Sequence, residues 1–233
     1  MTTHRMLPLY EAKMIHHYDH RWATYEADGS IRDVTVDEKR DPNYVVQPRY
    51  WVRAEAVSDR LADRWDRDWL LGWRRVARST DERTFICTKL EDVGIGDSIF
   101  VMLPSSAAHP EFLQAVLSSF VFDFVLRQKI GGTNTSFFLI EQIPLPSPEQ
   151  HWGIAADPID WFTQRVVQLG QVDAADELRA EIDAAAFHLY GIDRADADYI
   201  METFPIVKRK DEAAHGEYRT KRLILEAYDR LAG

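Results

Sequence analysis

Short apolar runs in the first half of the chain predict the strands of a small sheet. Residues 70–77, 84–90 and 98–103 are rich in β-branched, aromatic and other apolar side chains, and turn-forming residues separate these runs. Before them, residues 7–26 form an ordered segment rich in aromatic residues and histidines, and the charge-rich residues 27–43 are typical of a loop. We therefore expect a small mixed or antiparallel sheet here.

Helical periodicity dominates the second half. Apolar side chains within residues 111–129 recur at a spacing that would bury much of one continuous helix, which Gly131 and Gly132 would end. This helix is expected to pack on the sheet. Four further segments have helical patterns: residues 160–170, 174–189, 193–204 and 218–231.

The proline-rich residues 144–148 favour a domain boundary or a stiff connection. The short apolar runs of the first half, the helical spacing of the second half and these prolines together predict an α+β fold in two parts. Residues 1–148 would hold the small sheet with its packed helices, and residues 149–233 would form a helical C-terminal lobe.

Three tryptophans leave the start of the first strand ambiguous. Trp65, Trp69 and Trp73 recur every four residues, which is typical of one face of a helix. A helix over residues 53–67 is also favoured by opposite charges at helical spacing. The helix could therefore extend to Trp73, with the first strand starting later.

Composition indicates a globular protein of a reducing compartment. Hydrophobic residues make up 45% of the 233 residues, and no apolar run approaches the roughly 20 residues that a membrane helix needs. Cys87 is the only cysteine, which excludes an internal disulfide framework, and the first residues lack the apolar stretch of a secretory signal. We expect a cytoplasmic protein that does not bind membranes.

Charge is distributed unevenly along the chain. The net charge of -10 argues against DNA binding when taken alone, because phosphate contacts need local positive potential. Residues 49–89 nevertheless contain ten basic against seven acidic residues, a net +3. Residues 151–233 contain ten basic against sixteen acidic residues, a net -6. The first of these regions is therefore the better candidate for contact with phosphates.

An arginine cluster lies in the basic region. Its candidates for contact with phosphates or base edges are Arg74, Arg75, Arg78, Ser79, Thr80 and Arg83. The alternative is a solvated strand edge whose arginines form ion pairs with Asp81 and Glu82.

A polar loop follows the long helix. Its candidate residues are Lys129, Thr133, Asn134, Thr135 and Ser136. The glycines allow close backbone approach to a ligand, and the Asn134 amide could read adenine through a paired donor and acceptor. A glycine helix stop with a capped turn would explain the glycines but not the run of hydroxyl residues.

The histidine-rich segment near the N-terminus allows three interpretations. His16, His17, Asp19 and His20 could bind a metal or activate water in a nuclease. The remaining histidines are scattered, so we favour a structural role or contact with phosphates for His16, His20 and Arg21. A short basic run at residues 208–210, extended by Arg219, Lys221 and Arg222, could add a second phosphate contact.

Four blocks of the sequence carry a resemblance to one family. In order, residues 7–21, 74–83, 120–146 and 189–222 resemble the C-terminal target-recognition region of large bacterial N6-adenine DNA methyltransferases from restriction-modification and DISARM-like phage-defence systems. In these enzymes the region is similar to the specificity domain of TaqI-like methyltransferases. The resemblance implies that residues 1–148 are a target-recognition domain that binds double-stranded DNA.

The motifs that would perform methylation are missing. The family's catalytic turn is Asn/Asp-Pro-Pro-aromatic, whereas the nearest stretch here, residues 41–44, reads Asp-Pro-Asn-Tyr. Residues 94–96, Gly-Ile-Gly, lack the strand-turn-helix context of an S-adenosylmethionine site. The chain would thus have no catalytic residue, cofactor or metal of its own. S-adenosylmethionine is expected on a partner methyltransferase domain or subunit, to which a nuclease or helicase could be joined.

Two alternatives remain open on the sequence. The chain could be a protein-interaction module of a phage-defence complex with little DNA affinity alone, which agrees with its negative charge. It could also be a metal-dependent nuclease that uses the histidine segment. Salt-sensitive duplex binding separates the first alternative from DNA recognition.

Overall fold

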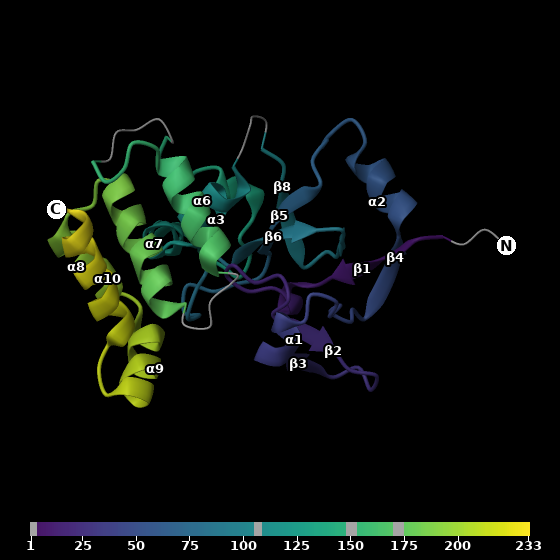
Figure 1. Ribbon diagram of the computed structural model, residues 1–233, viewed down its shortest axis with the longest axis horizontal. Helices are drawn as coiled ribbons and strands as arrows, with labels where there is room; N and C mark the ends of the chain where they lie inside the picture. Colours follow the sequence, from purple (N-terminus) through teal and green to yellow (C-terminus); the bar gives the residue numbers. More distant parts are fainter. Residues whose placement is uncertain (1–3, 105–108, 148–152, 170–174) are drawn as a thin grey trace. The chain divides into compact units, whose positions relative to one another are not determined.

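The computed structural model describes residues 4–104, 109–147, 153–169 and 175–233. Its contacts divide the chain into two compact units. Unit 1 consists of Met1–Val76 and Ile86–Ala108, and unit 2 consists of Ala77–Phe85 and His109–Gly233. Small sheets and long helices are both present (Figure 1), so the expected α+β class with a helical C-terminal region is confirmed.

The described residues of unit 1 form three small sheets. In the first, β1 (Met6–Tyr10) pairs antiparallel with β4 (Tyr50–Arg53) and parallel with β7 (Gly94–Ile95). The second is the hairpin of β2 (Ala23–Tyr25) and β3 (Ile31–Asp33). The third is antiparallel and consists of β5 (Trp69–Arg74), β6 (Cys87–Glu91) and β8 (Ile99–Met102) in the order β6-β5-β8. The three strand runs expected from the sequence correspond to this third sheet.

Short helices connect the strands of unit 1. They are the 3-10 helix η1 (Ala12–Met14), α1 (Val36–Arg40) and α2 (Ala54–Leu61). Thr35 and Glu38 form a capping box at the start of α1, which stabilises a helix of only one turn. The segment 27–43 is thus partly ordered and not a plain loop. The hydrophobic core of the unit joins Tyr10, Met14 and Ile15 to residues of the third sheet such as Leu70, Leu90 and Ile99.

One glycine of unit 1 is required by close packing. A Cβ atom on Gly72, in the central strand β5, would lie 2.8 Å from Leu90 Cδ1 and 3.0 Å from Ile99 Cγ2. Leu90 lies in β6 and Ile99 at the start of β8. Any larger residue at position 72 would therefore displace the Leu90 side chain.

Unit 2 is helical. Its helices are α3 (Pro110–Ser118), α4 (Phe120–Lys129), α5 (Phe137–Ile140), α6 (Pro158–Leu169), α7 (Asp176–Leu189), α8 (Arg194–Glu202), α9 (Pro205–His215) and α10 (Arg219–Leu231). Helix α7 packs against α3, α4, α6 and α10 and buries most of its last three turns, including Phe187. Alanines at positions 184–186 allow this close approach from several sides.

The prediction of one continuous helix over residues 111–129 is wrong. Ser119 has extended backbone angles (φ -69°, ψ 155°) and separates α3 from α4. Its hydroxyl accepts a hydrogen bond from Phe122 N at 3.3 Å and donates one to Val116 O at 2.6 Å. One fully buried serine therefore ends the first helix and caps the second, although the apolar spacing runs through both.

The helical interpretation of the tryptophans is also wrong. Helix α2 ends at Leu61, and both Trp69 and Trp73 lie in strand β5. A spacing of four residues places side chains on one face of a helix, but because four is even it also places them on one face of a strand. The β5 strand begins at Trp69, before the start that the sequence suggested.

Two helices of unit 2 were not expected from the sequence, α5 and α9. The boundary expected at residue 148 falls among residues that the structure does not describe. In the division by contacts, residues 109–147 belong with the helical C-terminal part. The assignment of residues 1–148 to target recognition stays a prediction.

Candidate nucleic-acid interface

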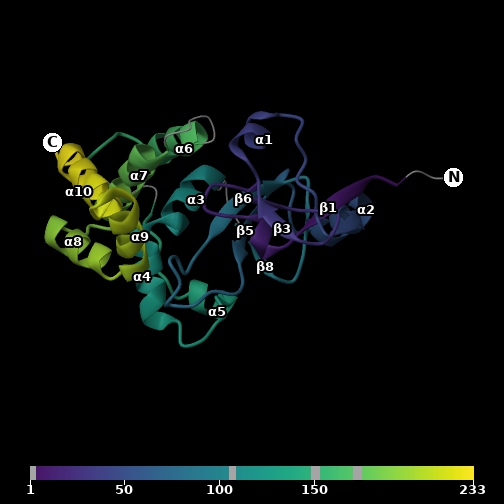
Figure 2. The ribbon, with the colours of Figure 1, turned by 90° about the horizontal axis from the view of Figure 1, so that it is seen from below.

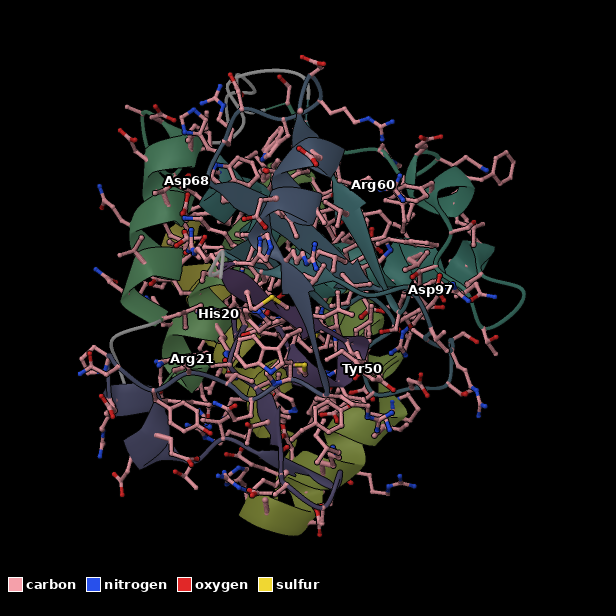
Figure 3. All side chains as sticks on the ribbon, turned by 90° about the vertical axis from the view of Figure 1, so that its right-hand side faces the viewer. His20, Arg21, Tyr50, Arg60, Asp68 and Asp97 are labelled. Carbon is pink, nitrogen blue, oxygen red and sulfur yellow. The ribbon has the colours of Figure 1, made fainter. Side chains whose placement is uncertain are left out.

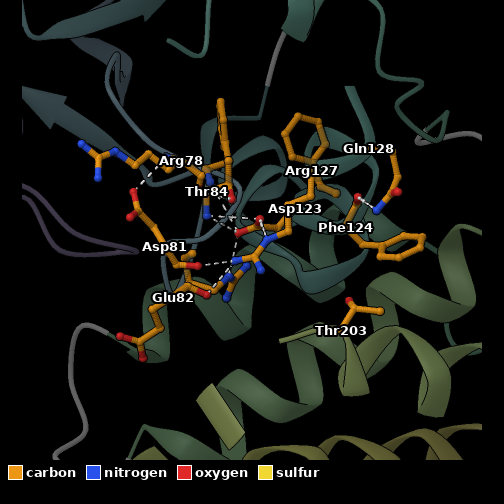
Figure 4. A network of polar contacts seen from close by, with 12 residues as sticks. Arg78, Asp81, Glu82, Thr84, Asp123, Phe124, Arg127, Gln128 and Thr203 are labelled. Atoms are coloured by element: carbon orange, nitrogen blue, oxygen red, sulfur yellow. Dashed lines mark hydrogen bonds and ion pairs between the residues drawn. The ribbon is translucent and has the colours of Figure 1, made fainter. Parts of the chain in front are cut away.

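A buried carboxylate in α4 organises the loop that connects β5 to β6. Asp123 is 0% exposed and accepts hydrogen bonds from Arg83 Nε at 2.9 Å, Arg127 Nε at 3.0 Å and Thr84 N at 2.9 Å (Figure 4). Two guanidinium groups and a backbone amide therefore satisfy one carboxylate without access to water. We call residues 77–85 the anchored loop.

Arg127 extends this anchorage to the loop backbone. Its Nη2 atom donates to Asp81 O at 2.7 Å and to Glu82 O at 2.9 Å. The arginines also lie over aromatic rings: Arg83 is 4.0 Å from the Phe120 ring centroid, and Arg127 is 4.1 Å from that of Phe204. The base of the anchored loop is thus bound to α4 through both its side chains and its main chain.

The tip of the anchored loop is exposed and internally braced. Arg78, Ser79 and Thr80 face solvent. The Asp81 carboxylate accepts a hydrogen bond from Arg78 N at 2.8 Å, and Thr84 Oγ1 donates to Arg78 O at 3.0 Å. The backbone of Arg78 is therefore fixed at both its amide and its carbonyl, while its side chain extends outward (Figure 4).

The structure brings the two loops predicted from the sequence together. Ala77 N donates a hydrogen bond to Thr133 O at 3.0 Å, which joins the anchored loop to residues 130–136 after α4. We call the latter the glycine loop. Thr133 and Asn134 are exposed, as is Lys129 at the end of α4, whereas Thr135 is fully buried and Ser136 is half-buried. Two exposed polar loops that are well separated in sequence are thus joined within unit 2.

Three of the four arginines in the predicted arginine cluster are occupied by contacts within the protein. Arg74 donates to Ile15 O at 2.5 Å, Arg75 pairs with Asp97 at 2.6 Å, and Arg83 binds Asp123. No carboxylate among the described residues pairs with the side chains of Arg78 and Lys129. In unit 2, these two are the cations of the candidate set that remain available to a ligand.

The candidates near the N-terminus belong to unit 1, together with Arg74 and Arg75. Arg21 donates to Asp41 O at 3.2 Å and to Lys39 O, so it holds the C-terminal end of α1 in place. The His16 ring lies 4.4 Å from that of Trp22, and His20 is exposed (Figure 3). The residues described by the structure contain no group of three His, Cys, Asp or Glu side chains placed to hold a metal ion.

The basic residues of the C-terminal region are mostly paired with acids. Lys208 and Lys221 both bind Glu202, Lys210 binds Glu82, and Arg222 lies between Glu217 and Glu226. Arg219 contacts Asp176 and Glu177. These pairs lower the positive potential that the sequence suggested for residues 208–222.

A second buried carboxylate lies beside the first. Asp183 of α7 accepts a hydrogen bond from Phe120 N at 2.8 Å, at the start of α4. Burial raises the pKa of the Asp183 carboxyl to about 6, and Arg83, Arg179 and the Phe120 amide oppose this rise, whereas Asp123 adds to it. The cost of burying the charge thus exceeds the gain from these neighbours.

We expect Asp183→Asn to change the pH dependence of stability. Because the pKa is raised from 3.8 to about 6 on folding, Asp183 favours the folded state most below pH 4, and this contribution is lost as the pH rises through 6. The asparagine variant, which keeps an acceptor for Phe120 N, should gain stability relative to the wild type between these pH values, by roughly 2–3 kcal/mol.

Urea unfolding from pH 4 to pH 8 measures this difference. Asp160→Asn, which changes an exposed carboxyl of α6, is the matched control. If the Asp183→Asn and wild-type profiles run parallel across this range, Asp183 does not titrate as inferred.

Asp123 and Arg127 were not singled out from the sequence. The available signal was a lone acid within the apolar residues 120–126, followed by an arginine one helical turn later. An acid in such a stretch cannot be buried without partners, and Arg127 at i+4 is the local one.

No family model matches this chain, and no curated protein matches it. None of the helices in the described part of the chain is both long enough and apolar enough to cross a bilayer.

Proposed function

We propose that this chain is the DNA-binding specificity portion of a bacterial N6-adenine DNA methyltransferase or of a fused restriction-modification enzyme. It would act in the cytoplasm as part of a phage-defence system. The observation that supports this function most directly is the hydrogen bond between Ala77 and Thr133. It joins the two loops that the sequence predicted to contact DNA. Their exposed side chains combine cations, hydroxyls and an amide, the groups that bind phosphates and base edges.

The proposed mechanism is one of positioning. Arg78 and Lys129 contact phosphates and fix the duplex, because their charges are not neutralised by acids of the described chain. Asn134 reads adenine with its amide, and the hydroxyls of Ser79, Thr80 and Thr133 contact phosphates or bases. A partner domain or subunit that carries S-adenosylmethionine flips and methylates the adenine.

One of the two acidic residues of the anchored loop is neutralised within the protein. Glu82 is paired with Lys210 of α9, whereas the Asp81 carboxylate accepts a hydrogen bond from Arg78 N and keeps its charge. Local potential at a surface depends on the charges that remain unpaired there and not on the net charge of the whole chain. A protein with net charge -10 can therefore bind DNA through this surface.

We expect the double variant Arg78→Ala/Lys129→Ala to lose salt-sensitive DNA binding. Each phosphate contact that is removed lowers the slope of log affinity against log salt by about one, so the double variant should lose about two. The measurement is the affinity of the purified chain for a random duplex between low and physiological salt.

The matched control is Arg209→Ala/Arg230→Ala. It removes two exposed arginines of α9 and α10, so the net charge changes equally. If both double variants reduce the slope equally, binding is a general charge effect and the two loops are not its site. If the wild-type chain does not bind at low salt, the proposal fails for the isolated chain.

A second candidate function is a protein-interaction module of a phage-defence complex. The observation that favours it is the charge of residues 151–233, which contain sixteen acidic against ten basic residues, with most basic residues of α8 to α10 paired with acids. Such a chain would bind DNA only with its methyltransferase partner. Duplex binding that appears only after the partner is added would support this candidate.

A further inference from the structure

Two phenylalanines project from the protein directly after the glycine loop. They are the first residues of α5, which follows the turn after α4 (Figure 2). Phe137 is 45% exposed and Phe138 is 72% exposed. Exposing an aromatic ring of this size is unfavourable in water, so a ring held outward beside a candidate binding surface indicates an interaction site.

The backbone that carries these rings is held on both sides. Thr135 before them is fully buried, and Ile140 and Ile143 after them are buried. Ser136 O accepts hydrogen bonds from Leu139 N and Ile140 N, which closes the short helix. The ring of Phe138 is therefore presented by an ordered support, and binding would not require this segment to fold first.

Hydrogen bonds from neighbouring side chains complete this support. Gln142 Nε2 donates to Phe138 O at 2.8 Å, and the hydroxyl of Tyr190, the residue directly after α7, donates to Pro144 O at 3.2 Å. The segment 137–144 is thus bound to itself and to the helical core. Its apolar tip stays outside that core.

The residues near Phe137 and Phe138 indicate which type of ligand the two rings would bind. Lys129, Thr133 and Asn134 lie shortly before Phe137 in the chain, and the hydrogen bond from Ala77 to Thr133 joins the loop that carries Arg78 to this segment. An apolar ring flanked by cations, hydroxyls and an amide matches a nucleic acid, whose apolar base faces lie between charged phosphates.

We propose that Phe138 is a wedge that stacks against a base step of the bound duplex and opens it, with Phe137 at its side. This inference rests on the proposed DNA-binding function. Proteins that insert apolar side chains between base pairs partly unstack the step and kink the duplex, by roughly 20–90°. A kink placed beside the base that Asn134 reads would assist the partner in extruding the adenine.

The test compares two duplexes that differ only in how easily one step opens. One is a fully paired duplex of random sequence, and the other has a single central mismatch, which reduces the cost of unstacking. The wild-type chain should bind the mismatched duplex about tenfold more tightly. Phe138→Ala should remove this preference, whereas Phe138→Trp should keep it because the indole also stacks.

Two controls accompany these variants. Tyr199→Ala removes another exposed aromatic ring of unit 2, on α8, and should leave the preference intact. Arg78→Ala should weaken binding of both duplexes by the same factor. Because the Phe138 ring is largely exposed, Phe138→Ala should also unfold at the wild-type temperature, which excludes a folding defect.

The outcomes separate the wedge from the function on which it rests. Salt-sensitive binding with equal affinity for both duplexes overturns the wedge and leaves the proposed function in place. Loss of assembly with the methyltransferase partner in Phe138→Ala, with the duplex preference unchanged, assigns the ring to a protein interface and also overturns the wedge. If neither duplex binds at low salt, both proposals fail.

Discussion

Replacing Asp123 with alanine is expected to lower the free energy of unfolding by about 3–5 kcal/mol. The variant leaves the guanidinium groups of Arg83 and Arg127 partly buried without their shared carboxylate. It also removes the acceptor for Thr84 N, a buried amide. A buried charge that loses its partner bears the full cost of desolvation, which exceeds what the pair contributed in the wild type.

Urea denaturation followed by circular dichroism measures this loss, and limited proteolysis adds a local readout. Cleavage at Arg78 or Arg83 should accelerate in Asp123→Ala, because the anchored loop is released from α4. Asp97→Ala, which removes an exposed carboxylate paired with Arg75, is the control and should cost less than about 1 kcal/mol. A loss below that value in Asp123→Ala would show that the anchored loop does not depend on this carboxylate.

In unit 1, Trp73→Ala should cost about 3–5 kcal/mol. Trp73 is 1% exposed in the central strand β5, and its ring meets that of Phe100 edge to face at a centroid distance of 5.7 Å. Neighbouring strands flank it on both sides, with Cys87 and Phe100 as its partners in register. The surrounding sheet cannot collapse into the space that the indole leaves, so a cavity remains.

The matched variant is Trp51→Ala. Trp51 lies in the edge strand β4 and is 46% exposed, so the same substitution should cost less than about 1 kcal/mol there. Thermal and urea unfolding of the two variants measure the difference. Equal losses for Trp51 and Trp73 would contradict the central position of Trp73 in the core.

The sequence predicted those helices and strands whose apolar spacing fits only one type of secondary structure. The three strands of the third sheet and the helices α6, α7, α8 and α10 have apolar spacings that fit a single period, and the structure agrees with them. The spacing of Trp69 and Trp73 fits two periods, so the start of the first strand stayed ambiguous until the structure placed both residues in β5. The break at Ser119 was missed because a serine within an apolar helix pattern signals a cap only when its backbone angles are known.

The candidate loops could be predicted, but the state of their arginines could not. Glycines, hydroxyls and clustered arginines are visible in sequence, so both loops were nominated. Arg83 is neutralised by an acid 40 residues away, and Arg74 is bound by a carbonyl 59 residues away. Periodicity carries no information on such distant partners. Only the fold therefore shows that Arg78 and Lys129 are the cations of the two candidate loops that remain available to a ligand.

Unit 2 is discontinuous in sequence, because residues 77–85 lie between two strands of unit 1. Exchange of segments between related proteins is constrained by this arrangement. A recombinant that inherits residues 109–233 from one parent and the anchored loop from another places Asp123 and Arg127 opposite a loop that did not evolve with them. The anchored loop and the helix that holds it would thus be exchanged as a matched pair, and a single crossover between the two segments would separate them.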